Sequence, residues 1–264
     1  MEKKRISRKP SLKHLIISLF ISALCLSATA GNGGDTIIFN QKNNKKSYMV
    51  THRSINKKYY HSLFWDIGYN RLDKSNMFTG AKHESAAGFP RLKNSTSTSF
   101  SVYTMLGRRI SGKFSIMSGL GVDFVNYRFS KDVTMKEIDG VAIQVPLASV
   151  FNNYSYMKKS KLGGTYLSVP VLLQLKFHRF FVAAGGTGGL NIGSHTRVEF
   201  VDFFGNKHKY KDYDIHPATF RYGYSMRAGF RYLSLFANYY VSPLFPKNEG
   251  PQVYPFVMGI SLRL

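Results

Sequence analysis

Large apolar residues alternate with small or charged residues near the end of the chain. Between residues 220 and 232 every second residue is apolar or aromatic, and arginine, glycine or serine lies between them. Residues 254–264 show the same alternation. Successive side chains of a strand point to opposite faces, so each segment is predicted to be a strand with one apolar and one polar face.

Weaker alternation marks six further segments, which makes eight predicted strands. They lie at residues 63–69, 100–110, 114–124, 167–177, 180–192, 220–232, 233–241 and 254–264. The links between them are alternately short and long, with long links at about residues 73–96, 129–161, 201–216 and 242–252. A barrel inserted from the periplasm has this arrangement. We therefore predict an all-β fold: an eight-stranded antiparallel transmembrane β-barrel with short periplasmic turns and long extracellular loops.

A soluble sandwich or lipocalin-like barrel would also alternate, but it would bury its apolar face. Two features favour the membrane. The chain has 21 Phe and 17 Tyr, and many of them fall at the two ends of the apolar faces, as in the aromatic belts of membrane proteins. The polar faces are rich in glycine and serine, which suits a narrow lumen.

The first thirty residues are typical of a secretory signal. A basic stretch precedes an apolar run over residues 15–28, and Ala28-Thr29-Ala30 resembles a cleavage site. The run is too short for a comfortable membrane-spanning helix. We expect residues 1–30 to be a cleaved signal peptide, residues 31–61 a basic periplasmic tail and residues 62–264 the barrel. The single cysteine, Cys25, would leave with the signal.

The charge is strongly positive, with 37 Lys and Arg against 14 Asp and Glu. In a cytoplasmic protein this balance would indicate nucleic acid, but export directs it toward lipopolysaccharide and other anions of the envelope. We expect outer-membrane lipid and lipopolysaccharide as partners, with a periplasmic or secretion-system protein as a further candidate. No nucleic acid and no cofactor are expected, and the protein should be a monomer in the membrane.

One segment, residues 166–175 with the sequence YLSVPVLLQL, resembles a proline-containing strand of the PorT-like outer-membrane β-barrel family, common in Bacteroidota. The resemblance extends loosely over residues 62–264. Ser168 stands where the family usually has an acidic residue, and Leu264 stands in place of the terminal aromatic common in barrel assembly signals. The resemblance implies an outer-membrane barrel, and one branch of the family serves protein secretion.

The polar strand faces place several charged residues in the predicted lumen. The candidates for ion pairs are Asp66, Asp123, Arg221, Arg227, Lys176 and Arg263, with Arg109 and Arg231 nearby. Counted from the short turns, Asp123 lies level with Arg221 and Asp66 with Arg227. Unpaired buried charges are costly, so we predict cross-lumen pairs. The glycines of residues 185–193 are expected to leave room for the arginines, and Pro170 is expected to mark a bulge.

Two basic clusters are predicted in the long loops: Lys158, Lys159 and Lys161, and Lys207, Lys209 and Lys211. No metal site and no catalytic group is predicted. The leading hypothesis is a non-enzymatic barrel with an envelope-structural, binding or secretion-accessory role. A small channel for ions or anionic solutes is the first alternative. A lipid-modifying enzyme is the second, because His83-Glu84-Ser85 resembles the His-x-Ser of outer-membrane lipid deacylases.

Overall fold

The computed structural model describes residues 37–42, 45–50, 59–77, 89–90, 92–93 and 96–264. The chain divides into two units, residues 1–57 and 58–264. The first contains an antiparallel hairpin of β1 (Ile37–Lys42) and β2 (Lys45–Val50), with Ile37 opposite Val50. The predicted tail thus includes regular structure. The predicted signal peptide and the His83-Glu84-Ser85 segment lie outside the described residues.

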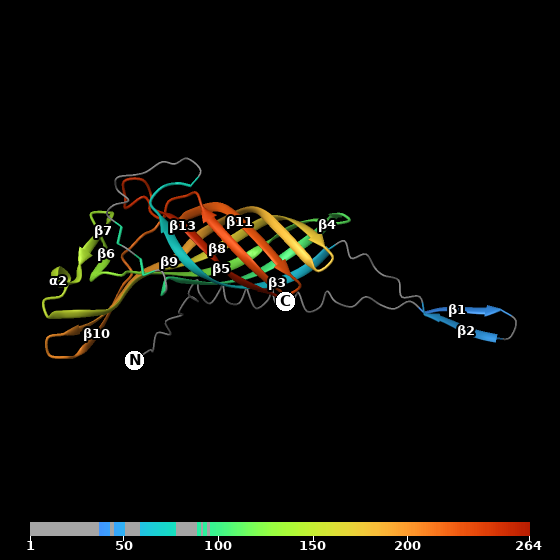
Figure 1. Ribbon diagram of the computed structural model, residues 1–264, viewed down its shortest axis with the longest axis horizontal. Helices are drawn as coiled ribbons and strands as arrows, with labels where there is room; N and C mark the ends of the chain where they lie inside the picture. The colour runs from blue at the N-terminus through green and yellow to red at the C-terminus, as the bar shows by residue number, and fades with distance from the viewer. Residues whose placement is uncertain (1–36, 43–44, 51–58, 78–88, 91, 94–95) are drawn as a thin grey trace, which may run out of the picture. The chain divides into compact units, whose positions relative to one another are not determined.

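The second unit is a ring of eight antiparallel strands (Figure 1). In chain order the strands are β3 (Tyr59–Asp73), β4 (Thr98–Ser111), β5 (Phe114–Arg128), β8 (Tyr154–Phe177), β9 (Phe180–Asp202), β11 (Phe220–Phe230), β12 (Leu233–Tyr240) and β13 (Tyr254–Arg263). Each pairs with the next, and β13 pairs with β3. All eight predicted strands are present, and the antiparallel barrel is confirmed.

The apolar strand faces point outward, away from the lumen. Trp65, Ile67 and Leu173 are 46%, 65% and 61% exposed, while charged Asp66 is 1% exposed. Exposed aromatic residues lie at both ends of this outer surface: Phe114, Phe177, Phe180 and Tyr232 near the short turns, and Phe124, Phe220 and Tyr222 near the long links. This inside-out distribution suits a lipid surround.

The loop end of the barrel contains more regular structure than predicted. A hairpin of β6 (Val133–Ile138) and β7 (Val141–Pro146) leads into the short helix α2 (Leu147–Val150), and β10 (Lys207–Asp212) pairs with the far end of β9. Strands β8 and β9 have 24 and 23 residues, and in Figure 1 they continue past the barrel toward β10. No helix in the described ranges is long and apolar enough to cross a membrane.

The prediction of loops at residues 129–161 and 201–216 is therefore wrong over β6, β7, β10 and the extended ends of β8 and β9. The extension has its own small core, in which Leu147, Tyr154, Val198 and Phe200 are buried together. Register shifts at 154/156 and 157/159 interrupt the apolar alternation of β8. The strand therefore lacks a continuous pattern in the sequence.

The predicted bulge at Pro170 is also absent. Ser118 pairs with Val171 and Gly121 with Ser168 in the same register, and Pro170 itself lies opposite Thr187 of β9. The pairing between β5 and β8 is interrupted at residues 169 and 170 without an extra residue on either strand. The missing donor of the proline is accommodated by a local gap in the ladder.

Candidate functional site

The barrel lumen is filled by side chains. In the half near the short turns, an apolar cluster contains Phe64, Tyr103, Met105, Met117, Leu172 and Ala183. In the half near the long links, a larger cluster joins strand residues such as Val125, Tyr127 and Leu162 to link residues such as Phe129 and Phe245. Two buried ion-pair networks complete the filling. An eight-stranded barrel is just wide enough for this kind of packing.

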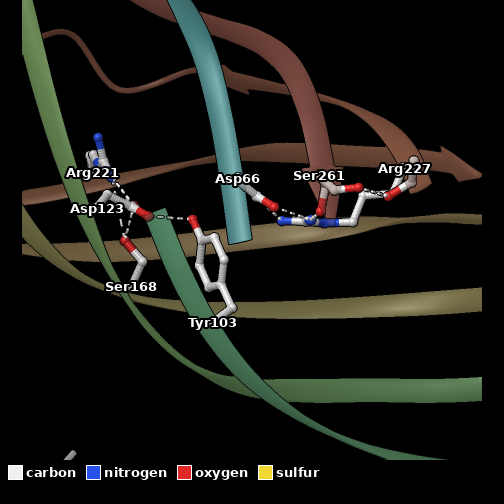
Figure 2. A network of polar contacts seen from close by, with 8 residues as sticks. Asp66, Tyr103, Asp123, Ser168, Arg221, Arg227 and Ser261 are labelled. Atoms are coloured by element: carbon white, nitrogen blue, oxygen red, sulfur yellow. Dashed lines mark hydrogen bonds and ion pairs between the residues drawn. The ribbon is translucent and has the colours of Figure 1, made fainter. Parts of the chain in front are cut away.

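The first network is centred on Asp123 of β5 (Figure 2). One carboxylate oxygen accepts a hydrogen bond from the Tyr103 hydroxyl at 2.5 Å. The other accepts from the Ser168 hydroxyl at 2.6 Å and from the guanidinium of Arg221 on β11. Asp123 and Arg221 are 2% and 5% exposed. Three donors from three other strands therefore neutralise and orient one buried carboxylate.

Two aromatic rings hold the guanidinium of Arg221. Its central carbon lies 3.7 Å from the ring centroid of Tyr166 and 4.3 Å from that of Tyr240. Both tyrosines are buried. A cation over an aromatic face is attracted by the ring quadrupole, most strongly where water is excluded. The rings thus stabilise a charge that would be costly to bury alone.

The second network pairs Arg227 of β11 with Asp66 of β3. Two parallel hydrogen bonds of 2.9 and 2.6 Å join the guanidinium to the carboxylate, and Ser261 accepts a third at 3.0 Å. The rings of Phe64, Tyr103 and Phe236 lie 5.0 to 5.5 Å from the guanidinium carbon. Figure 2 shows this network beside the first. The structure thus brings together both pairs expected from strand position.

Arg263 lies in the lumen near the short turns, and in the described part of the chain no carboxylate accepts a hydrogen bond from it. Its Nε donates to the Ser62 hydroxyl at 3.1 Å. The rings of Tyr60, Phe64 and Phe181 lie 5.4 to 5.6 Å from the guanidinium carbon. Arg263 thus extends the series of ring-flanked arginines rather than forming one of the ion pairs.

Lys176 was expected among the ion-pair candidates, but it is exposed. It lies at the end of β8, next to the β8–β9 turn, where its backbone N–H donates to the Lys113 carbonyl. Arg109 and Arg231 are likewise exposed, and Arg231 has φ of 55° in a turn. Strand parity alone placed these three inside, whereas the ends of the strands project beyond the packed lumen.

Small residues create the space for the networks. A Cβ on Gly189 would lie 2.9 Å from Ser168 Oγ and 3.0 Å from Arg221 Nε. The glycine therefore leaves room for Arg221, as expected. The sequence pattern did not reveal the contributions of Tyr103, Tyr166, Ser168, Tyr240 and Ser261. Their inward position could be read from strand parity, but their partners depend on pairing between distant strands.

The basic clusters are on strands rather than in loops, which corrects their predicted setting. Lys158, Lys159 and Lys161 belong to the extended part of β8, and Lys207, Lys209 and Lys211 to β10. The register places Lys159 and Lys209 on either side of Glu199, and Lys161 and Lys211 on either side of Arg197. The backbone ladder thus joins the two clusters into one surface.

A hydrogen-bonded turn joins β9 to β10. Asp202 accepts from the backbone N–H groups of Phe204 and Asn206 at 2.9 and 2.8 Å, and its other oxygen lies 2.9 Å from His208 Nε2. The contact with His208, with support from these N–H groups, lowers the pKa of the Asp202 carboxyl below its usual value. The arrangement orders the tip of the extension.

The buried networks are suited to neutralising charge inside the barrel. Each carboxylate is engaged by an arginine, Asp123 also accepts hydrogen bonds from two hydroxyl groups, and both carboxylates are buried. Breaking one partner of such a pair leaves a buried charge without compensation. Their chemistry is therefore structural: they fix the relative positions of strands that are distant in the sequence.

Several solved structures are similar to this chain. Neisserial surface protein A is 13% identical, with 78% of this chain and 97% of that chain covered at a TM-score of 0.34. Ail, the attachment invasion locus protein of Yersinia pestis, is 12% identical, with 77% and 97% covered at a TM-score of 0.33. Ail in complex with the heparin analogue sucrose octasulfate is 13% identical, with 77% of this chain and 97% of that chain covered at a TM-score of 0.32. No curated protein matches the sequence.

A family model described as outer membrane protein beta-barrel domain matches residues 66–245. The match covers well over half of the chain, including most of the barrel and the extension. It agrees with the ring of eight strands and with the outward-facing apolar surface. The chain therefore belongs to the outer membrane protein beta-barrel domain family and is an outer-membrane protein.

Proposed function

We propose that this protein is a non-enzymatic anchor, in which a closed barrel holds the β8–β9–β10 extension and the long links at the cell surface. Its role would be envelope-structural, binding or secretion-accessory. The observation that carries the proposal is the packing of the lumen. Arg221 and Arg227 are at most 5% exposed and lie between apolar clusters in both halves of the barrel.

A packed lumen favours an anchor over a channel. A conducting path would need water along the barrel axis, but the cross-section is occupied by Phe64, Tyr103 and the Asp66–Arg227 pair in one half and by Tyr127 and Tyr166 in the other. The anchor hypothesis also agrees with the long, ordered extension of β8 and β9 beyond the barrel.

The experiment is single-channel recording of the full chain folded into planar bilayers. We expect no conductance steps from the wild-type protein. A variant that opens the lumen and removes both charges of one pair, Asp123→Ala with Arg221→Ala, provides a positive control for detection. Regular conductance steps from the wild type would overturn the anchor proposal in favour of the channel. Mass spectrometry of lipid A from cells with and without the protein tests the enzyme hypothesis, and a mass change would overturn the non-enzymatic assignment.

We also propose that the chain belongs to the PorT-like branch of outer-membrane barrels. Its support is the strand at residues 166–175, whose Pro170 lies in the barrel wall. Ser168, at the position where that family usually has an acid, donates to Asp123 in the lumen. In this chain the carboxylate that contacts Arg221 therefore comes from Asp123 on the neighbouring strand β5. Cleavage of residues 1–30, which N-terminal sequencing of the exported protein would test, is part of the same proposal.

A further inference from the structure

Four cations lie side by side on four adjacent strands at the base of the extension. Arg128 of β5 pairs with Lys161 of β8, Lys161 pairs with Arg197 of β9, and Arg197 pairs with Lys211 of β10. Neighbouring strands are about 4.8 Å apart, so this cation row spans about 14 Å. Like charges directly opposite each other on a sheet destabilise it. The row therefore has an unfavourable energy that an anion would relieve.

The contacts of the row neutralise it only in part. Arg197 pairs with Glu199 at 2.6 Å, the single carboxylate that contacts the row among the described residues. Arg128 donates to the Lys158 carbonyl, Lys161 to the Asn126 side chain, and Lys211 lies over the Tyr213 ring.

The row is on the outward face of the sheet, continuous with the surface that faces lipid. The alternate residues Tyr127 and Leu162 are buried in the lumen cluster, so Arg128 and Lys161 point the other way. Four residues back along β5, on the same face as Arg128, lies Phe124 of the aromatic belt, which is 44% exposed.

The height of the row fits the charged layer of the membrane. Four residues of strand advance about 13 Å, or about 10 Å along the axis of a barrel with the usual strand tilt. Aromatic belts mark the boundary between hydrocarbon and headgroups. The headgroup layer beyond that boundary is about 5–8 Å thick. The backbone of Arg128 and Lys161 therefore lies about 10 Å beyond the boundary, just past the outer edge of this layer. Long cationic side chains at this height can reach back to the phosphates of the outer leaflet.

We propose that the cation row binds phosphate groups of lipopolysaccharide in the outer leaflet around the barrel. The inference rests on the proposed orientation, with the long links outside. It commits to the membrane's own lipid because the cations continue the lipid-facing surface instead of forming a separate lobe. Lys159 and Lys209, two residues further out and on either side of Glu199, extend the positive surface toward phosphates on the sugars.

The test compares two variants that each lose four charges. R128Q/K161Q/R197Q/K211Q removes the row, and R108Q/K113Q/K176Q/R179Q removes four exposed cations at the opposite, short-turn end. The full chain is folded in detergent, and binding of lipid A is measured by native mass spectrometry. We expect the first variant to bind at least tenfold more weakly and the second to match the wild type. Enzymatically dephosphorylated lipid A should bind the wild type as weakly as lipid A binds the row variant.

A second variant, K161Q/K211Q, keeps the Arg197–Glu199 pair and guards against misfolding of the first. It should bind lipid A severalfold more weakly while retaining heat-modifiable gel migration. Equal loss in the control variant, or equal binding of dephosphorylated lipid A, overturns the proposal. So does row-dependent binding of soluble heparin without row-dependent binding of lipid A. If the wild-type protein itself lacks heat-modifiable gel migration, the proposed barrel anchor is overturned, and not only the lipid-binding proposal.

Discussion

Arg227 and Asp66 form two parallel hydrogen bonds inside the barrel although they are 161 positions apart in the chain. The pair joins β11 to β3 across the lumen. Both side chains are 1% exposed, so neither charge has water as an alternative partner. The closed ring brings them together.

Asp66→Ala should destabilise the barrel by about 3–5 kcal/mol, because it leaves the Arg227 charge buried without its partner. Urea unfolding of the protein in lipid vesicles measures the change. The double variant Asp66→Leu with Arg227→Met should recover most of the loss, since apolar replacements of a buried pair are often neutral. A double variant as unstable as Asp66→Ala would show that the pair does not account for the effect.

Exchanging the charges of Asp123 and Arg221 tests the first network. Each single reversal, Asp123→Arg or Arg221→Asp, puts two like charges together in the lumen and should reduce the folded fraction seen as heat-modifiable migration. The double reversal restores opposite charges and should raise that fraction above either single variant. Recovery will be partial, because Tyr103 and Ser168 are positioned to donate to a carboxylate at residue 123. Additive damage would contradict direct pairing.

Gly189→Val should destabilise the barrel by about 1–3 kcal/mol or more, as overpacking does in filled interiors. The new Cβ would meet Ser168 Oγ and Arg221 Nε at 2.9 and 3.0 Å. The matched control is Gly188→Val on the same strand, where a Cβ has no neighbour within 4 Å. We expect the control to unfold at the wild-type urea concentration. Equal effects of the two substitutions would refute the role of Gly189 as space for Arg221.

The tip of the extension should loosen in acid. The pKa of Asp202 is lowered in the folded protein, so its contribution is fully present above the ordinary carboxyl pKa of 3.8 and is lost as pH falls through the lower, folded value. The amide protons of Phe204 and Asn206, which donate to Asp202, report this in NMR spectra. Their shifts should titrate with a midpoint below 3.8. A midpoint at or above 3.8 would contradict the prediction, and Asp202→Asn should abolish the titration.

Much of the barrel could be predicted because the side-chain period of a strand is two. That period alone distinguishes the lipid face, with Trp65 and Leu173, from the lumen face, with Asp66 and Arg227. It was insufficient at strand ends. Lys176 has the parity of a lumen residue, but it lies next to the β8–β9 turn, beyond the packed interior, and is exposed.

The sequence by itself determined the eight strands of the barrel, the alternation of short and long links and, except at the strand ends, which residues face inward, since these depend on local periodicity and turn length. Only the tertiary structure decided the pairing of Tyr103 and Ser168 with Asp123, and the alignment of Arg128 with Lys161, Arg197 and Lys211. These depend on the register of three or four neighbouring strands, and irregularities such as the one between Thr165 and Tyr166 shift that register. The ring closes through contacts between residues far apart in the chain, which local patterns do not encode.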